Sequence, residues 1–285
     1  MSLYEESGAV LGQIAVSAND EALYLILHTL RLPMDSSALV LARKTSPFEN
    51  EDLASVFRRR IFEKMPAAYI THEAWLGGER FYVDDRVLIP RSYFLEIIPG
   101  ELNSWIHAPA KVSRVVDVCT GSGCLAILLA RHFPKAKVDA VDLSADALAV
   151  ADVNVREFGL TRRVSLYQSD VFDSVPPVKY DLILSNPPYE PSRHCDLLAE
   201  EFKREPRLAL DGGNDGLGII RKLLIQSRSR LTPHGIVMVE VGGLREAVDQ
   251  EFGALEPHWL PTQDGSDCVF VVNATRLKAW RPKTT

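Results

Sequence analysis

Residues 185–190 read SNPPYE and follow an apolar run, so an amide, two prolines and an aromatic ring stand together. The side-chain oxygen of Asn186 can accept a hydrogen bond, and so can the backbone carbonyl of Pro187 or Pro188. Two such acceptors suit the two hydrogens of a planar nitrogen, whose delocalised lone pair makes it a weak nucleophile. The prolines stiffen the loop, and Tyr189 can cover the planar group. The stretch therefore predicts a site that aligns a planar nitrogen for attack.

A glycine-rich turn, DVCTGSG at 117–123, follows another apolar run and precedes the helical pattern CLAILLARHF. Gly121 and Gly123 let the backbone approach a ligand where a Cβ would collide. In open α/β sheets, ligands bind at the carboxyl ends of strands, where this turn is expected. The third glycine of the dinucleotide fingerprint is missing, because Ala126 and Ile127 occupy that region. The sequence therefore predicts a nucleotide-type pocket that differs from the dinucleotide-binding one. The alternative is that the glycines serve only tight packing.

Three aspartates indicate which chemical groups the ligand carries. Asp117 precedes the turn and suits an ammonium group rather than a pyrophosphate, and Asp142 ends the second expected strand, where it can accept from a ribose diol. Asp170 ends the third strand and either accepts from an adenine amino group or only caps the strand end. Adenosine together with an amino-acid group points to S-adenosylmethionine, which is the predicted cofactor. The predicted cofactor-binding residues are Asp117, Cys119, Thr120, Gly121, Ser122, Gly123, Asp142, Leu143, Asp170, Val171, Phe172 and Asn186; the predicted catalytic residues are Asn186, Pro187, Pro188 and Tyr189.

The elements that must position these residues form two groups. From about residue 111, apolar runs alternate with helical patterns, which is typical of a parallel, doubly wound sheet. Before that point the chain reads as a small helical segment, followed by a hairpin within 79–90 and the start of a helix at 91–98. We expect helices over 19–30, 50–65 and 215–231, strands over 114–119, 137–143, 164–170, 180–185 and 234–242, and a closing hairpin that ends with 268–273.

Composition excludes several classes of protein. The chain has 285 residues, of which 46% are hydrophobic and 25% charged, as in ordinary soluble proteins. It lacks an apolar run of the ~20 residues that a membrane helix needs, and its acidic start lacks the basic region of a secretory signal, so we expect a cytoplasmic protein. Its four cysteines form no Cys-x-x-Cys pair, so we expect no metal site and no disulfide framework. The net charge of −6 argues against binding to nucleic acid.

The stretches VVDVCTGSGCLAI, AVDLSADALAVA, YDLILSNPPY and EPRLALDGGNDGL resemble the class I methyltransferase core of the HemK-like protein-glutamine N-methyltransferases. The resemblance extends over nearly the whole chain. MPAAYITHEAWLGGERFYVDDRVLIPRS resembles the branch that methylates a glutamine of large-subunit ribosomal protein L-three. The release-factor branch usually has Pro-Arg-Pro-(Asp/Glu)-Thr-Glu where this chain has PRSYFLEII.

The resemblance implies a Rossmann-like, mostly parallel seven-stranded sheet and an enzyme that methylates a glutamine side chain. It implies a helical substrate-recognition domain (1–78), a hairpin and linker helix (79–110) and a catalytic domain (111–285). It also implies that residues 186–189 hold the glutamine amide, that 88–91 lie over the pocket, and that 205–213 brace the active-site loop. Release factor is the alternative substrate. Two alternatives remain. One is an adenine-N(6) nucleic-acid methyltransferase, which a test of binding to duplex DNA would detect. The other is a non-catalytic ribosome-assembly factor, which methyl transfer into ribosomal protein would exclude.

Overall fold

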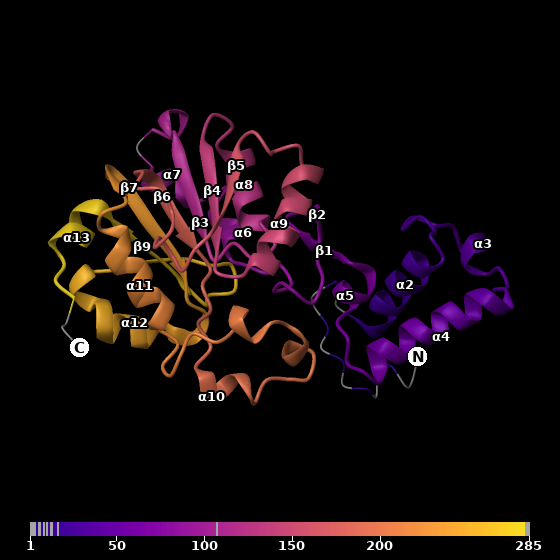
Figure 1. Ribbon diagram of the computed structural model, residues 1–285. Coiled ribbons are helices and arrows are strands. Elements are labelled where there is room, and N and C mark those ends of the chain that lie inside the picture. The colour runs from indigo at the N-terminus through magenta and orange to yellow at the C-terminus, as the bar shows by residue number, and fades with distance from the viewer. Residues whose placement is uncertain are drawn as a thin grey trace.

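The structure is a computed structural model that describes residues 17–106 and 108–282, together with the separate positions 4, 7, 9, 11, 14 and 15. A small lobe of N-terminal helices stands beside a large lobe in which helices cover both faces of a sheet (Figure 1). Over the described residues, no helix has the length and apolar character needed to cross a membrane.

The large lobe is built on a seven-stranded sheet with the order β5-β4-β3-β6-β7-β9-β8. The first five strands in this order are parallel, and β9 runs antiparallel to both of its neighbours, β7 and the edge strand β8. This confirms the predicted fold class and the closing hairpin. The order reverses at β3, which has β4 on one side and β6 on the other, and such a switch point is where open α/β sheets bind ligands. The strands are β3 Arg114–Val118, β4 Lys137–Asp142, β5 Val164–Gln168, β6 Tyr180–Ser185, β7 Leu231–Glu240, β8 His258–Leu260 and β9 Val269–Asn273.

Two layers of apolar side chains enclose the sheet. Val115 and Leu182 belong to the core on one face, whereas their chain neighbours Val116 and Ile183 belong to the core on the other. Because both faces are covered, the strands read as continuous apolar runs rather than as alternating ones. The helices of this lobe are α6 Phe94–Ile97, α7 Leu102–Trp105, α8 Cys124–His132, α9 Ala145–Glu157, α10 Ser192–Cys195, α11 Gly218–Ser227, α12 Arg245–Phe252 and α13 Ala274–Ala279.

The small lobe contains α2 (Ala18–Thr29), α3 (Ala38–Leu41), α4 (Pro47–Ile61) and α5 (Ala67–Thr71). The predicted helices over 19–30 and 50–65 are confirmed as α2 and α4. Helix α4 begins earlier than predicted, because Ser46 and Glu49 form a capping box with Pro47 as its first helical residue.

The hairpin predicted within 79–90 is wrong in position. Strands β1 (Glu73–Leu76) and β2 (Glu79–Tyr82) pair antiparallel, and residues 83–90 form no strand. Gly77 and Gly78 connect them with φ of +63° and +76°, which is the conformation of a two-residue hairpin turn. The Gly-Gly pair was therefore the hairpin signal. Residues 84–87 form a turn instead of a second strand, and residues 88–92 continue without regular structure.

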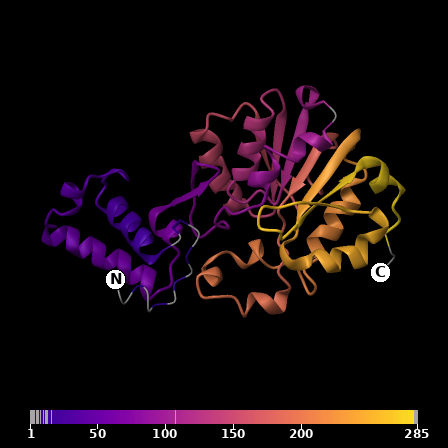
Figure 2. The same ribbon diagram turned by 180° about the vertical axis from the view of Figure 1, so that it is seen from behind.

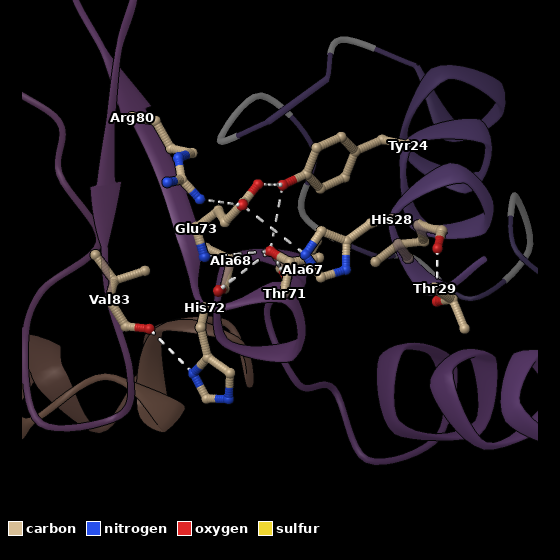
Figure 3. Close-up of polar contacts among 11 residues, drawn as sticks. Tyr24, His28, Thr29, Ala67, Ala68, Thr71, His72, Glu73, Arg80 and Val83 are labelled. Atoms are coloured by element: carbon tan, nitrogen blue, oxygen red, sulfur yellow. Dashed lines mark hydrogen bonds and ion pairs between the residues drawn. The ribbon is translucent and has the colours of Figure 1, made fainter. Parts of the chain in front are cut away.

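Glu73 joins the small lobe to the hairpin. Its Oε2 accepts a hydrogen bond from the Tyr24 hydroxyl of α2 (3.1 Å), and its Oε1 accepts one from Nη1 of Arg80 on β2 (2.7 Å). Tyr24 also contacts Thr71 Oγ1 at 3.3 Å, and His28 Nε2 lies 4.0 Å from Glu73 (Figure 3). One carboxylate thus fixes the orientation of α2 relative to both strands.

A buried ion-pair cluster makes a second connection between the lobes. Arg60 of α4 is 1% exposed, and its Nε donates to Oε1 of Glu21 on α2 at 2.6 Å. Its Nη1 donates at 3.2 Å to Oε1 of Glu201, which belongs to the long segment between α10 and α11. This segment, in orange around α10, lies beside the small lobe in both views (Figures 1 and 2). The cluster therefore ties two small-lobe helices to the segment that follows Asn-Pro-Pro-Tyr.

Candidate active site

The glycine-rich turn follows β3 and is built from residues with positive φ. Cys119, Gly121 and Gly123 have φ of +63°, +54° and +80°, respectively. A Cβ on Gly123 would lie 3.1 Å from the Cβ of Ala151, so this glycine lets α8 and α9 pack closely. A Cβ on Gly121 would meet nothing within 4 Å. The two glycines therefore differ in role: Gly123 serves packing, and Gly121 borders open space.

Asp117 lies beneath this turn and is fully buried. Its Oδ2 accepts from Thr120 Oγ1 (2.6 Å) and from the Ala126 backbone N–H (3.0 Å), whereas no described residue hydrogen-bonds its Oδ1. Burial raises the pKa of this carboxyl to about 7. A buried carboxylate oxygen without a partner is costly, and an ammonium group nearby would stabilise the charged form.

Asp142 ends β4 and faces the turn. Its Oδ2 accepts from the Gly121 backbone N–H (2.8 Å) and its Oδ1 accepts from that of Ser144 (2.9 Å). Burial raises the pKa of the Asp142 carboxyl above its usual range. Each carboxylate oxygen keeps capacity for another hydrogen bond, so the pair can still accept from two hydroxyl groups.

The turn after β5 carries the third aspartate. Asp170 Oδ2 lies 2.7 Å from Lys222 Nζ on α11. Its neighbour Val171 has φ of +54°, which is strained for a β-branched residue and is typical of ligand sites and other functional positions. The Phe172 ring is buried and stacks 5.9 Å from that of Tyr180.

A cavity at the carboxyl ends of the strands gathers most of the predicted residues. Its walls include Cys119, Gly121, Asp142, Leu143, Asp170, Val171, Asn186 and Pro188. Five other predicted residues lie behind these walls rather than on them, namely Asp117, Thr120, Ser122, Gly123 and Phe172. The prediction from sequence missed several wall residues, among them Arg86, Val87, Ala147 and Ile219, and it assigned Pro206, Leu208 and Ala209 only to the segment that braces the loop.

A second cavity lies on the other side of Asn186. It is lined by Leu88, Arg91, Asn186, Pro187, Tyr189, Glu190, Leu198, Phe202, Ala209 and Leu210. Asn186 follows β6 directly and borders both cavities. A group bound in one cavity can therefore meet a group bound in the other at this residue.

Glycines fix the conformation of the Pro-Pro-Tyr loop. A Cβ on Gly212 would lie 2.7 Å from the Pro188 carbonyl oxygen, and one on Gly216 would lie 2.3 Å from that of Tyr189. A Cβ on Gly242, after β7, would lie 2.5 Å from the Tyr189 ring. The backbone of Glu190 also pairs with residues 210–212, since its N–H donates to the Leu210 carbonyl and its carbonyl accepts from Gly212. The segment expected to brace the loop does contact it on this side.

Two buried carboxylates hold the segment 89–93 above the strand ends. Glu205 accepts from Arg91 Nη1 at 2.8 and 3.0 Å, and Glu240, at the end of β7, accepts from the Tyr93 backbone N–H at 3.1 Å and from the Ser92 hydroxyl. Burial raises the pKa of both carboxyls, that of Glu240 to about 7. The segment in turn contacts Asn186, whose Nδ2 donates to the Arg91 carbonyl at 3.4 Å.

None of the four cysteines forms a disulfide. Among the described residues, no group of three or more His, Cys, Asp or Glu side chains is arranged to hold a metal ion. The hydrogen-bond acceptors around the two cavities include the carboxylates of Asp142 and Asp170 and the amide of Asn186, and these match the hydroxyl, amino and ammonium groups of an adenosyl amino acid.

If Asp142 holds ribose hydroxyls, replacing it by alanine should weaken S-adenosylmethionine binding ~10- to 150-fold, because a hydrogen bond to a charged acceptor contributes roughly 1.5–3 kcal/mol. Calorimetric titration measures this affinity. Asp146→Ala, an exposed carboxylate in the first turn of α9, is the matched control and should bind normally. Unchanged affinity in Asp142→Ala would remove the ribose assignment.

Known proteins resemble this chain over part or nearly all of its length. The family model named Methyltransferase small domain matches residues 102–214. A Ribosomal protein uL3 glutamine methyltransferase of Burkholderia pseudomallei is 43% identical, with 98% of this chain and 93% of that protein covered. A protein of the same name from Neisseria meningitidis serogroup A is 44% identical, covering 97% and 91%. One from Bradyrhizobium diazoefficiens is 42% identical, covering 90% and 82%.

Among solved structures, the hMettl16 catalytic domain in complex with MAT2A 3'UTR hairpin 1 aligns with a TM-score of 0.50 and 13% identity, covering 81% of each chain. At this identity the likeness concerns the fold alone, which is that of the class I S-adenosylmethionine-dependent methyltransferases. The sequence relatives show more than the fold, because the alignments extend over nearly the full length of this chain and of each relative. This chain belongs to the family of ribosomal protein uL3 glutamine methyltransferases.

Proposed function

We propose that this protein transfers a methyl group from S-adenosylmethionine to the side-chain amide nitrogen of one glutamine in ribosomal protein uL3, the L-three protein of the large subunit. The observation that carries the proposal is the position of Asn186 between two cavities, one with nucleotide-type walls and one bounded by the Pro-Pro-Tyr loop. The relatives named above are called uL3 glutamine methyltransferases, and they support this choice of substrate.

The first cavity would hold the cofactor, which supplies an electrophilic methyl group when bound. Asp142 would accept from the ribose hydroxyls and Asp170 from the adenine amino group, with Leu143 and Val171 against the ring. Asp117 would place a negative charge beneath the turn for the ammonium group, an assignment that its unpaired Oδ1 supports. Cys119 and Gly121 would form the wall, and Thr120, Ser122, Gly123 and Phe172 would maintain its shape.

The second cavity would hold the glutamine side chain. The Asn186 Oδ1 would accept one hydrogen of the amide nitrogen, and the carbonyl of Pro187 or Pro188 would accept the other. Tyr189 would cover the amide plane. Two acceptors in fixed positions favour the geometry in which the nitrogen lone pair points at the methyl carbon, and the rigid loop avoids a reorganisation cost during the reaction. The proton would leave to solvent after transfer.

The small lobe would recognise the protein substrate, with residues 1–78 as the recognition domain, 79–110 as the connection and 111–285 as the catalytic domain. Residues 1–100 contain ten Lys or Arg and fourteen Asp or Glu, which gives a formal charge of −4. Ribosomal proteins are basic, so an acidic recognition surface would steer their encounter in the cytoplasm. Such steering requires no contact between the enzyme and nucleic acid.

Labelled S-adenosylmethionine incubated with purified uL3 and with a peptide-chain release factor tests the substrate. We expect label in uL3, located by mass spectrometry on one glutamine, with a rate that falls as salt concentration rises. A uL3 variant with that glutamine changed to asparagine is the control and should remain unlabelled. Label in release factor and not in uL3 would contradict the proposed substrate.

A further inference from the structure

We propose that the backbone carbonyl of Arg91 sets the orientation of the Asn186 amide, and that Glu205 and Glu240 are positioning residues that hold this carbonyl in place. The inference rests on the proposed function, because it concerns how Asn186 presents its oxygen to the substrate amide. It assigns a catalytic consequence to two buried carboxylates that touch neither reacting group.

The first step concerns the amide itself. A backbone carbonyl only accepts hydrogen bonds, so the side-chain group of Asn186 that faces Arg91 must be the donor, Nδ2. The Oδ1 then points away from Arg91, and no described residue donates to it. Without the Arg91 carbonyl, no hydrogen bond would distinguish the two orientations of the Asn186 amide. A half-turn about the Cβ–Cγ bond would then exchange Oδ1 and Nδ2, so that a donor would face the substrate in place of an acceptor. A donor facing the substrate N–H would repel it.

The second step concerns what fixes the carbonyl from the side of the small lobe. The Arg91 guanidinium is held by both oxygens of Glu205 and lies over the Phe202 ring, 5.1 Å from its centre. Glu205 also accepts from the Ile89 backbone N–H at 3.2 Å. One carboxylate therefore ties both the side chain of Arg91 and the backbone two residues earlier to the segment between α10 and α11.

The third step concerns the other side of the segment. Glu240 follows Val239, which pairs in register with Ser185, so Glu240 and Asn186 end neighbouring strands at the same edge of the sheet. Its contacts with Ser92 and Tyr93 fix the two residues after Arg91. The peptide unit that carries the Arg91 carbonyl is thus held on both sides. Burying two carboxyl groups for this purpose is costly unless they are hydrogen-bonded, and each of them has several donors.

The variant Asn186→Asp distinguishes two roles of the side chain: its orientation by the Arg91 carbonyl, and its acceptance of a hydrogen bond from the substrate amide. A protonated aspartic acid can donate to the Arg91 carbonyl and present its other oxygen to the substrate, as asparagine does. Its anion has no donor, so two acceptors would face each other and the side chain would turn away. The ratio of the single-turnover rate of Asn186→Asp to that of the wild type should rise as pH falls from about 8.5 to 5.5, by up to about tenfold per pH unit.

The wild-type profile in the same range corrects this ratio for other groups that titrate or carry charge around the position. These groups are Arg86, Arg91, Asp117, Cys119, Asp142, Asp170, Tyr189, Glu190, Glu205, Asp211 and Glu240. A ratio that stays flat, or that rises with pH because the carboxylate is simply a stronger acceptor, would overturn the proposed role of the Arg91 carbonyl.

The variant Glu205→Gln tests the positioning residues directly. It keeps the shape of the side chain but lacks the charge and one acceptor, so kcat should fall ~10-fold while the KM for S-adenosylmethionine stays within about twofold. Calorimetry and thermal unfolding give readouts that do not depend on turnover, and both should remain close to the wild type. Glu200→Gln, an exposed carboxylate on the same segment, is the control and should leave every value unchanged.

The outcomes separate the two proposals. Wild-type protein that fails to label uL3 contradicts the proposed function. Active wild-type protein whose Glu205→Gln variant keeps normal kcat, or loses cofactor affinity in proportion to kcat, contradicts the positioning role.

Discussion

Replacing Asn186 by alanine is expected to lower the turnover of glutamine methylation by ~10²- to 10³-fold, while S-adenosylmethionine binds to within a few-fold of its normal affinity. The size follows from other enzymes in which one preorganised hydrogen-bonding group is removed from the reacting centre. A free amide nitrogen attacks poorly, so catalysis depends on aligning it, and Asn186 supplies one of the two aligning acceptors. Single-turnover rates with uL3 and calorimetry with the cofactor measure the two quantities.

Asn214→Ala is the matched control, because this asparagine is exposed in the neighbouring loop 211–216. It should keep both turnover and cofactor affinity. Near-normal turnover in Asn186→Ala would refute the amide-holding mechanism. A loss of cofactor affinity as large as the loss of turnover would instead make Asn186 a cofactor ligand.

The parts of the fold that the sequence predicts are those governed by local patterns. Strands buried on both faces read as apolar runs, and the turns that follow β3, β4, β5 and β6 carry glycine, aspartate, asparagine or proline. Because parallel strands place their carboxyl ends at one edge, the sequence alone assigns residues such as Asp142 and Asn186 to one site. The structure places both on the wall of the same cavity.

The parts that the sequence does not predict depend on contacts between distant segments. Glu205 and Arg91 are 114 positions apart, and Glu240 and Ser92 are 148 apart. Neither carboxylate differs in its local pattern from an ordinary surface residue. The cavity wall around Arg86 and Val87 is of the same kind, since it comes from a turn that belongs to no helix or strand. The true hairpin did have a local signal, the Gly77–Gly78 pair. The prediction placed the hairpin too late because β-forming residues are also frequent in 79–90.

Asp117 and Phe172 have contacts within the protein that the sequence does not reveal. The carboxylate of Asp117 holds Thr120 and the start of α8, and the ring of Phe172 packs in the core beneath Val171. Both positions lie one layer behind the cavity wall. Spacing in the sequence identifies the turn that carries the site, whereas the side of the turn to which each side chain points depends on the packing around it.

The buried Arg60 cluster leads to the second large effect, which concerns both stability and the protein substrate. Arg60→Ala leaves the carboxylates of Glu21 and Glu201 buried near each other without their shared cation, and breaking a buried ion pair in this way costs about 3–5 kcal/mol. The midpoint of urea unfolding should fall accordingly, whereas Arg58→Ala, on the exposed face of the same helix, should leave it nearly unchanged.

Arg60→Ala should also affect activity in a particular way. Glu201 is next to Phe202 in the sequence and three positions after Leu198, and both of these line the second cavity, whereas the segment first reaches the wall of the cofactor cavity at Pro206. Under conditions where the variant is folded, the KM for uL3 should therefore rise more than the Kd for S-adenosylmethionine. Equal changes in both constants would mean that Arg60 supports the fold as a whole and does not connect the small lobe to the acceptor cavity.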